Sequence, residues 1–236
     1  MQIFPSLLLT IIAISSILIF LLLALFILPS LISATQFDSQ QAQETKTIDS
    51  CKKIELGGKY ILTKDILDVK FEKSIGGCIV FNAPNIEFDC RGHRILSSSE
   101  KTVGLTINEN GATVKNCFIS MQDGTGIAVL ESSKAFIINN TLKENKYSIF
   151  LYSSYNNSIE NNFMERNQYG LTLVTSSDNN LIVGNKINES LNYAVFLSGS
   201  SNNLLKDLYV TDTKRDVFLF GATSSNNFLN NILITG

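Results

Sequence analysis

The chain has 236 residues, of which 44% are hydrophobic and 17% are charged, and its formal net charge is −2. A near-neutral chain without a basic cluster lacks the electrostatic footprint of nucleic-acid-binding proteins, so we expect no nucleic acid as a partner. Trp is absent, which argues against a tryptophan platform for sugar binding.

An apolar segment opens the chain. Residues 3–33 are nearly all apolar, and at about 1.5 Å per residue a helix of this length crosses a bilayer core of roughly 30 Å. A cleaved signal peptide normally has a Lys or Arg near its start and a shorter apolar core, whereas the first Lys or Arg here is Lys46. We therefore predict that residues 1–34 form a transmembrane anchor, with a cleaved signal segment as the alternative. Both interpretations place the rest of the chain outside the cytoplasm.

A polar segment follows the apolar one. Residues 35–50 are rich in Gln and are predicted to be a linker. Residues 48–62 are predicted to form a cap, because the end of a repetitive sheet exposes strand edges and core. Residues 51–236 are then a single repeat domain.

One phrase occurs five times between Gly126 and Asn231, with a period of about 23 residues. It consists of a short apolar strand, a Ser-Ser turn, a second apolar strand and often an Asn-Asn pair. Such a period indicates a solenoid or a similar array. The unit contains strands and turns but no helical pattern, so we predict a parallel β-helix with one repeat of about 22–24 residues per coil.

The core of a parallel β-helix must be apolar in coil after coil. Coils stack at the strand spacing of roughly 4.8 Å, so each residue lies above its equivalent one period earlier. Side chains alternate along a strand, and inward positions therefore form columns. Three predicted core columns are Ile107, Val129, Leu151, Leu173, Leu197 and Leu219; Leu105, Ile127, Ile149, Leu171, Val195 and Val217; and Ile119, Leu142, Met164, Ile187, Val210 and Ile234.

A polar column is more specific. Cys117, Asn140, Asn162 and Asn185 stand at steps of 23, 22 and 23 residues. Asn tolerates the left-handed backbone of a tight corner, and stacked amides can pass hydrogen bonds from coil to coil. We predict a structural ladder at these three Asn residues. An Asn-rich disordered segment is the alternative, but disorder gives no reason for regular apolar columns.

Residues 51–236 resemble the right-handed parallel β-helix repeat superfamily, which includes NosD-type periplasmic proteins and archaeal surface proteins. The opening coils carry part of this resemblance, in Gly57-Gly-Lys-Tyr-Ile-Leu-Thr-Lys-Asp-Ile66, Cys78-Ile-Val-Phe81 and Gly92-His-Arg-Ile95. It implies an all-β, right-handed, single-stranded solenoid, to which the apolar segment adds an N-terminal transmembrane helix. It does not imply an activity, because one fold hosts many functions. The NosD name raises copper, but one His and 3 Met are too few soft ligands, so we expect no metal and no cofactor.

Four cysteines occur, at Cys51, Cys78, Cys90 and Cys117. An even number in a chain outside the cytoplasm favours disulfides. Cys90 and Cys117 lie about one coil apart, so these two pair if the geometry allows, and Cys51 with Cys78 is the residual pair. The alternative is four buried, reduced thiols. Zinc is disfavoured, because the spacings of 27, 12 and 27 residues include no close ligand pair.

The single histidine, His93, has Asp89, Arg91 and Arg94 close in sequence, which would suit acid–base chemistry. Gly92-His93 also suits a plain turn after a strand, and we favour that structural role. Charges in later coils form a mixed-sign outward column typical of a solvated surface: Glu144, Arg166, Glu189 and Asp212. We therefore predict no catalytic residues.

Tyr147, Tyr169 and Tyr193 fall at steps of 22 and 24 residues. A tyrosine column of this kind can stack on sugar rings, but more often it packs on itself as a stabilising ladder. Two Asn-X-Ser sequons make Asn156 and Asn188 candidate glycosylation sites, whereas a third, at Asn139, lies beside the Asn ladder.

These observations predict a membrane-tethered protein on the cell surface or in the periplasm, secreted if the first segment is cleaved. It is expected to be a non-catalytic recognition or structural module with polysaccharide as its expected ligand, and the tyrosine column is a candidate ligand face. The alternative is a carbohydrate-active enzyme, either a polysaccharide lyase, a hydrolase or a uronan epimerase. A further alternative is end-to-end self-association through the last coil, residues 232–236, which carries no polar cap.

Overall fold

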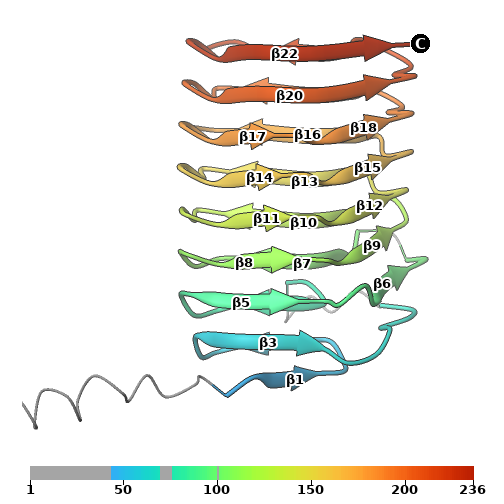
Figure 1. Ribbon diagram of the computed structural model, residues 1–236, viewed down its shortest axis with the longest axis vertical. Coiled ribbons are helices and arrows are strands. Elements are labelled where there is room, and N and C mark those ends of the chain that lie inside the picture. The colour runs from blue at the N-terminus through green and yellow to red at the C-terminus, as the bar shows by residue number, and fades with distance from the viewer. Residues whose placement is uncertain (1–43, 70–75, 100) are drawn as a thin grey trace, which may run out of the picture. The chain divides into compact units, whose positions relative to one another are not determined.

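The computed structural model describes residues 44–69, 76–99 and 101–236, and every regular element in them is a β-strand. The strands wind into a solenoid whose coils stack in parallel (Figure 1). The predicted all-β parallel β-helix is thus confirmed. The predicted anchor, residues 3–33, lies outside the described residues, and within them there is no helix of the length and apolarity that a membrane span needs.

One face of the solenoid is an eight-stranded parallel sheet, to which each coil contributes one strand. The unit therefore has eight coils. The strands of this eight-stranded face, in order, are β2 (Lys52–Ile54), β4 (Ile79–Phe81), β7 (Val103–Ile107), β10 (Thr125–Leu130), β13 (Tyr147–Tyr152), β16 (Tyr169–Val174), β19 (Tyr193–Ser198) and β21 (Phe218–Phe220).

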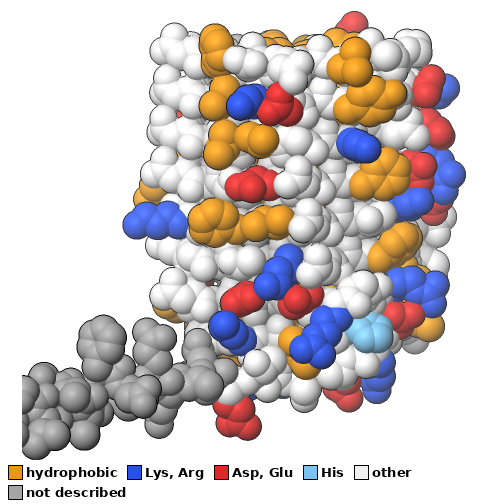
Figure 2. All heavy atoms as spheres, viewed as in Figure 1, with side chains coloured by type: hydrophobic (Ala, Val, Ile, Leu, Met, Phe, Trp, Pro, Cys, Tyr) orange, Lys and Arg blue, Asp and Glu red, His pale blue; other side chains and the backbone are white. Residues whose placement is uncertain are grey.

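The other strands form one 14-stranded sheet that covers two further faces. The ascending face consists of β1 (Lys46–Ile48), β3 (Gly58–Leu62), β5 (Ile86–Asp89), β8 (Thr113–Lys115), β11 (Phe136–Ile138), β14 (Ser158–Glu160), β17 (Leu181–Val183), and the first halves of β20 (Leu204–Thr211) and β22 (Phe228–Thr235). The return face consists of the second halves of β20 and β22 with β18 (Lys186–Asn188), β15 (Phe163–Glu165), β12 (Thr141–Lys143), β9 (Phe118–Met121) and β6 (Arg94–Ser97). Figure 2, in the same view as Figure 1, shows apolar side chains in vertical runs over these two faces.

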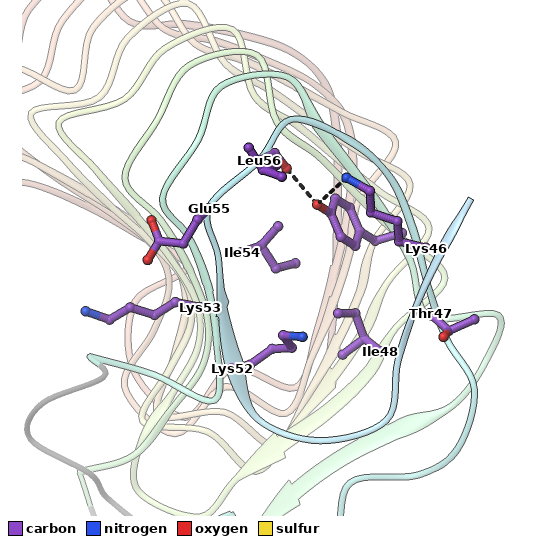
Figure 3. Close-up of a pocket in the computed structure, with 9 residues that line it drawn as sticks. Lys46, Thr47, Ile48, Lys52, Lys53, Ile54, Glu55 and Leu56 are labelled. Atoms are coloured by element: carbon purple, nitrogen blue, oxygen red, sulfur yellow. Dashed lines mark hydrogen bonds between the residues drawn. The ribbon is translucent and has the colours of Figure 1, made fainter. Parts of the chain in front are cut away.

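The first coil begins at Lys46, inside the segment predicted to be a linker, and occupies the segment predicted to be a cap. Its Ile48 and Ile54 are buried and point into the coil (Figure 3). All 40 residues of the buried hydrophobic cluster lie between Ile48 and Val210. Residues 44–236 therefore form a compact unit that carries its own core.

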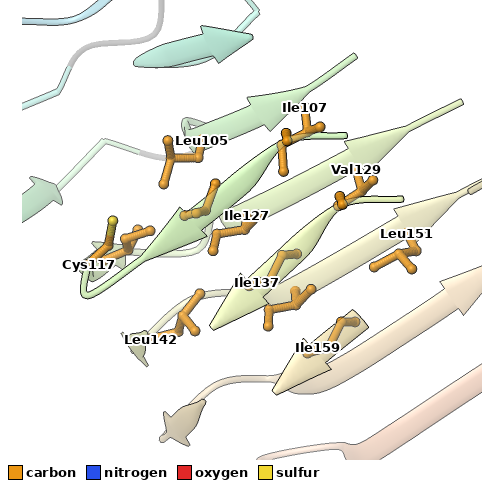
Figure 4. Close-up of a cluster of buried hydrophobic side chains, with 14 of the residues drawn as sticks. Leu105, Ile107, Cys117, Ile127, Val129, Ile137, Leu142, Leu151 and Ile159 are labelled. Atoms are coloured by element: carbon orange, nitrogen blue, oxygen red, sulfur yellow. The ribbon is translucent and has the colours of Figure 1, made fainter. Parts of the chain in front are cut away.

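The predicted core columns are present. Val129 pairs with Ile107 below it and Leu151 above it, and all three are fully buried (Figure 4). The column from Ile119 to Ile234 also has the predicted register, but Ile234, predicted to be in the core, is 50% exposed because no described coil covers it.

The register predicted for the last strand of the eight-stranded face is wrong by one residue. Phe218 pairs with Val195 and Phe220 pairs with Leu197, where Val217 and Leu219 were expected. The reason is the corner between β20 and β21, which takes one residue more than the pattern allowed. A one-residue slip moves a side chain to the opposite face of a strand.

Asn140, Asn162 and Asn185 lie one above the other inside a corner of the solenoid. Asn162 Oδ1 accepts hydrogen bonds from the backbone N–H and from Nδ2 of Asn140 at 2.9 and 3.0 Å. Asn185 Oδ1 does the same for Asn162, at the same two distances. Leu208 takes the next position, and there the two short strands of earlier coils merge into the long β20.

Two more Asn ladders, which the sequence reasoning missed, occupy the other corners. One consists of Asn157, Asn180, Asn203 and Asn227. The other is the shorter pair Asn145 and Asn167. In each rung an amide oxygen accepts from the backbone N–H of the coil below. The residue before the ladder residue has a positive φ in most coils, as at Asn156 (55°), Asn161 (53°) and Arg166 (53°), which turns the chain sharply enough to bring the amide inside.

The two disulfides join neighbouring coils. Cys51 is bonded to Cys78, and Cys90 to Cys117, each across 27 residues of chain. Both staples lie in the N-terminal half of the solenoid. Bonds that close loops of this length typically stabilise a domain by about 2–4 kcal/mol each.

Candidate functional site

The eight-stranded face carries the tyrosine column. Tyr147, Tyr169 and Tyr193 begin β13, β16 and β19 and are in register. The ring centroids of Tyr147 and Tyr169 are 5.0 Å apart, and those of Tyr169 and Tyr193 are 6.1 Å apart. All three side chains are partly exposed. The column thus packs on itself and also faces solvent.

Small residues directly after the tyrosines hold the strands in place. Ser148, Gly170 and Ala194 are buried at this position. A Cβ atom on Gly170 would lie 2.4 Å from the carbonyl oxygen of Ala194 and 2.8 Å from a methyl group of Ile187. Only a residue without a side chain fits there, so close coil-to-coil contact fixes where the Tyr169 ring emerges.

A second outward column adds two more rings. Phe150, Thr172 and Phe196 are in register across β13, β16 and β19. Phe150 lies 5.3 Å from Tyr147, centroid to centroid, and Phe196 lies 6.4 Å from Tyr169 and 6.3 Å from Tyr193. We call the five rings the aromatic face. Thr172 is buried among these columns, and its hydroxyl has no hydrogen-bond partner within the described residues.

Polar side chains border the aromatic face. Lys146, Gln168 and Asn192 each directly precede a tyrosine of the column. Lys146 Nζ lies 5.4 Å from the centroid of the Tyr147 ring, and Gln168 Nε2 donates to Asp123 Oδ1 at 2.8 Å. Rings next to amide and ammonium groups offer apolar contact and hydrogen bonds together.

His93 has a different partner from the one its sequence neighbours suggest. Its Nδ1 lies 3.2 Å from Asp65 Oδ1, and Asp65 also accepts from the backbone N–H and Nε of Arg94 at 2.9 and 2.7 Å. Asp89 instead accepts from the backbone N–H of Arg91. The hydrogen bond from the Arg94 amide, followed by that from its side chain, lowers the pKa of Asp65 from 3.8 to about 2.

This lowered pKa predicts an acid-dependent loss of stability. The folded-state value is below the unfolded one, so the contacts of Asp65 stabilise the protein above about pH 4 and are lost as pH falls toward 2. We expect the thermal midpoint of Asp65→Asn to fall less steeply between pH 4 and pH 2 than that of the parent protein. Asp216→Asn, at an exposed position, is the control. Parallel curves for Asp65→Asn and the parent protein would contradict the assignment.

The charged column that was predicted to face outward lies at a corner of the solenoid and faces solvent there. Glu144, Arg166, Glu189 and Asp212 all have positive φ angles. Arg166 pairs with Glu144 at 2.7 Å, and exposed pairs of this kind contribute little to stability. The column is a solvated edge.

The candidate glycosylation sites differ in environment. Asn156 is exposed in a corner with φ of 55°. Asn188 lies in β18, where it accepts a hydrogen bond from Thr211 and donates to Glu189 at 3.3 Å. Of the two, Asn156 is the more accessible.

The first coil contains a cavity of about 300 Å³ (Figure 3). Lys46 lies over the ring of Tyr60, with Nζ 5.3 Å from its centroid, and the Tyr60 hydroxyl donates to the carbonyl of Leu56. Ile48 and Ile54 line the cavity from the core side. It is the N-terminal end of the apolar core, rimmed by lysine side chains.

A family model described as "Periplasmic copper-binding protein (NosD)" matches residues 63–236. Among solved structures, the enzymatically active domain of tailspike protein 2 from bacteriophage CBA120 is similar with a TM-score of 0.60 and 12% identity, over 81% of this chain and 38% of that one. The catalytic domain of a GH87 alpha-1,3-glucanase in complex with nigerose has a TM-score of 0.47 and 17% identity, over 81% and 40%. The chain thus spans well under half of either protein, and likeness at such identity shows the fold alone. A search of curated proteins found no match.

The residues present do not fit the copper of the family description. Copper sites use Cys, Met and His ligands grouped around one point. All four cysteines are in disulfides, Met121 and Met164 are fully buried in the core, and His93 faces Asp65. No group of three or more His, Cys, Asp or Glu side chains suited to a metal occurs in the part of the chain that the structure describes.

Proposed function

The chain belongs to the NosD family of periplasmic proteins, and from this premise we propose that it is an extracytoplasmic, membrane-tethered, non-catalytic module whose aromatic face binds a polysaccharide. The two disulfides support a location outside the cytoplasm, because such bonds persist in oxidising compartments. Residues 3–33 would be the tether, and retention of this segment in the mature protein, measured by intact mass, tests that part.

The single observation that carries the ligand proposal is the aromatic face. Five rings from three coils form one continuous surface, with Lys146, Gln168 and Asn192 beside it. Because Tyr147 and Tyr169 stack on each other, a ligand on the sheet would meet ring edges and hydroxyl groups. All three tyrosines are partly exposed, and a tyrosine hydroxyl can both donate to and accept from a sugar.

The register supports one direction for a bound polymer. Equivalent residues recur in each coil at about 4.8 Å along the solenoid axis. A chain molecule lying along this axis would meet a tyrosine edge, an amide or ammonium group, and the second column in each of the three coils of the aromatic face. A repetitive ligand matches a repetitive surface, whereas a compact ligand would use one coil only.

Replacing Tyr169 tests the proposal. Tyr169 contacts both other tyrosines and Phe196, so Tyr169→Ala is expected to weaken polysaccharide binding by about tenfold or more, as loss of a central aromatic anchor does. A polysaccharide array with the protein of residues 44–236 identifies the ligand, and calorimetry measures the variants. Tyr155→Ala, at a 49% exposed tyrosine outside the aromatic face, is expected to bind normally. Equal losses in both variants, or no binding to any polysaccharide, would reject the proposal.

The enzymatic alternative rests on the Asp65–His93 contact. A carboxylate that orients an imidazole is a common device of acid–base catalysis. The Asp65–His93 contact lies beside the return face, whereas the aromatic face lies on the eight-stranded sheet. The contact and the aromatic face therefore do not form one cleft. Product release from a bound polysaccharide, abolished by His93→Ala, would support a lyase, hydrolase or epimerase in place of the binding module.

End-to-end self-association remains a prediction. Leu233 and Ile234 in β22 are about half exposed, and a strand edge with apolar neighbours favours pairing. Ile234→Lys should reduce such association in sedimentation experiments.

A further inference from the structure

The outer surface of the ascending face carries an exposed apolar stripe. Five residues are in register on neighbouring strands, in the order Phe136, Ser158, Leu181, Leu204 and Phe228. Phe136 is 45% exposed, Leu181 38% and Phe228 60%. Figure 2 shows hydrophobic side chains over β11, β17, β20 and β22 on this side. Ser158, which is polar and buried, separates Phe136 from Leu181, Leu204 and Phe228. Exposed apolar side chains gathered on one face usually mark an interaction site.

A second column runs beside the stripe, two residues along each strand. Its members, on the same five strands, are Ile138, Glu160, Val183, Lys206 and Asn230. Its two charges have opposite signs, and each lies one strand away from Val183. Glu160 makes no ion pair within the described residues, and Lys206 has only the adjacent Asp207, at 3.7 Å.

The large apolar and charged members of the two columns are arranged in matching pairs about β17. Leu181 and Val183 are at the centre, Glu160 and Lys206 are one strand away on opposite sides, and Phe136 and Phe228 are two strands away. A two-fold axis along β17, in the plane where two copies meet, relates the copies so that their coils run in opposite order. Each column of one copy then lies opposite the same column of the other copy. Phe136 then lies opposite Phe228 and Glu160 opposite Lys206, whereas Ser158 lies opposite Leu204 and Ile138 opposite Asn230.

We propose that the ascending face is the interface of an antiparallel homodimer with its two-fold axis along β17. Leu181 and Val183 each contact the same residue of the second copy. Glu160 lies opposite Lys206 and Phe136 opposite Phe228, twice each, as an isologous interface requires. The apolar stripe supplies affinity and the charge pairs fix orientation and register. The aromatic face, on the other sheet, stays open to a ligand.

Sedimentation equilibrium tests the dimer directly, with the protein of residues 44–236, which carries its own core. The parent protein is expected to sediment at twice its chain mass. Leu181→Lys places two ammonium groups against each other at the axis and is expected to sediment as a monomer. The matched control is Leu191→Lys, at a 49% exposed leucine between β18 and β19, which is expected to remain dimeric. A monomeric parent protein, or a dimer indifferent to Leu181→Lys, would overturn the proposal.

Charge reversal tests the antiparallel register. Glu160→Lys and Lys206→Glu each create two like-charge contacts and are expected to raise the dissociation constant at least about tenfold. The double variant restores opposite charges at both contacts and is expected to return close to the parent value. Each variant must keep the parent circular dichroism spectrum and thermal midpoint to count. Failure of the double variant to recover, or loss of the dimer in Ile234→Lys, would replace this interface with another one, such as end-to-end contact.

Discussion

Asn162→Ala is expected to lower the free energy of unfolding by about 3 kcal/mol or more. The side chain is 1% exposed, and its Oδ1 accepts from both nitrogen donors of Asn140. Its Nδ2 donates to the carbonyl of Ile137 at 2.8 Å and to Asn185 Oδ1 at 3.0 Å. Alanine would leave several buried polar groups without partners, and each such group costs about 1–3 kcal/mol.

Asn156→Ala is the matched control. This asparagine is also in a corner but is exposed, and its own N–H still reaches the carbonyl of Asp178. The cost is limited to placing alanine at a φ of 55°, which is about 1–2 kcal/mol. Urea unfolding with the disulfides intact measures both variants. Equal losses of stability would show that the ladder bonds contribute no more than corner geometry does.

The period in the sequence was enough to predict the fold and most of the core. Inward apolar positions must recur in every coil, so the columns through Val129 and Leu142 could be aligned by counting residues. The cysteines could be paired for the same reason, because residues one coil apart are neighbours in space. Counting failed where a corner changed length, which is why Phe220, and not Leu219, lies above Leu197.

Features that depend on orientation within a corner were missed. Asn156 and Asn157 are adjacent and chemically identical, yet one is exposed and the other is in a buried ladder. The positive φ of the first residue decides which amide turns inward, and a run of two Asn does not reveal that choice. The signal that could have found the ladder is the recurrence of the second Asn at Asn180, Asn203 and Asn227.

Only part of the candidate site could be predicted from the sequence, for a related reason. The tyrosine column follows from spacing, but Phe150 and Phe196 belong to the same surface only because the strands place both columns outward. Asp65 lies 28 residues from His93, in an irregular coil whose length no repeat predicts. Residue types recur less regularly in surface columns than in core columns, because many kinds of side chain are tolerated in contact with solvent.

Leu151→Ala is expected to lower the free energy of unfolding by about 2–5 kcal/mol, as removal of a fully buried leucine does. Leu151 has no exposed surface and lies between Val129 in the coil below and Leu173 in the coil above. A cavity at this point weakens two coil-to-coil contacts at once. Leu191→Ala, at a half-exposed position, is the control and should change stability by less than about 0.5 kcal/mol.

The loss caused by Leu151→Ala should be unevenly distributed along the solenoid. Each coil contacts only its neighbours, so stability is approximately a sum over adjacent pairs. Both disulfides lie before Leu151, the later one ending at Cys117, so the coils after it have no covalent staple. Hydrogen exchange should therefore show protection lost mainly from β16 onward, while β4 to β10 stay protected. Uniform loss along the chain would mean that the eight coils unfold as one cooperative unit, and the disulfides would then stabilise the distant coils as much as their own.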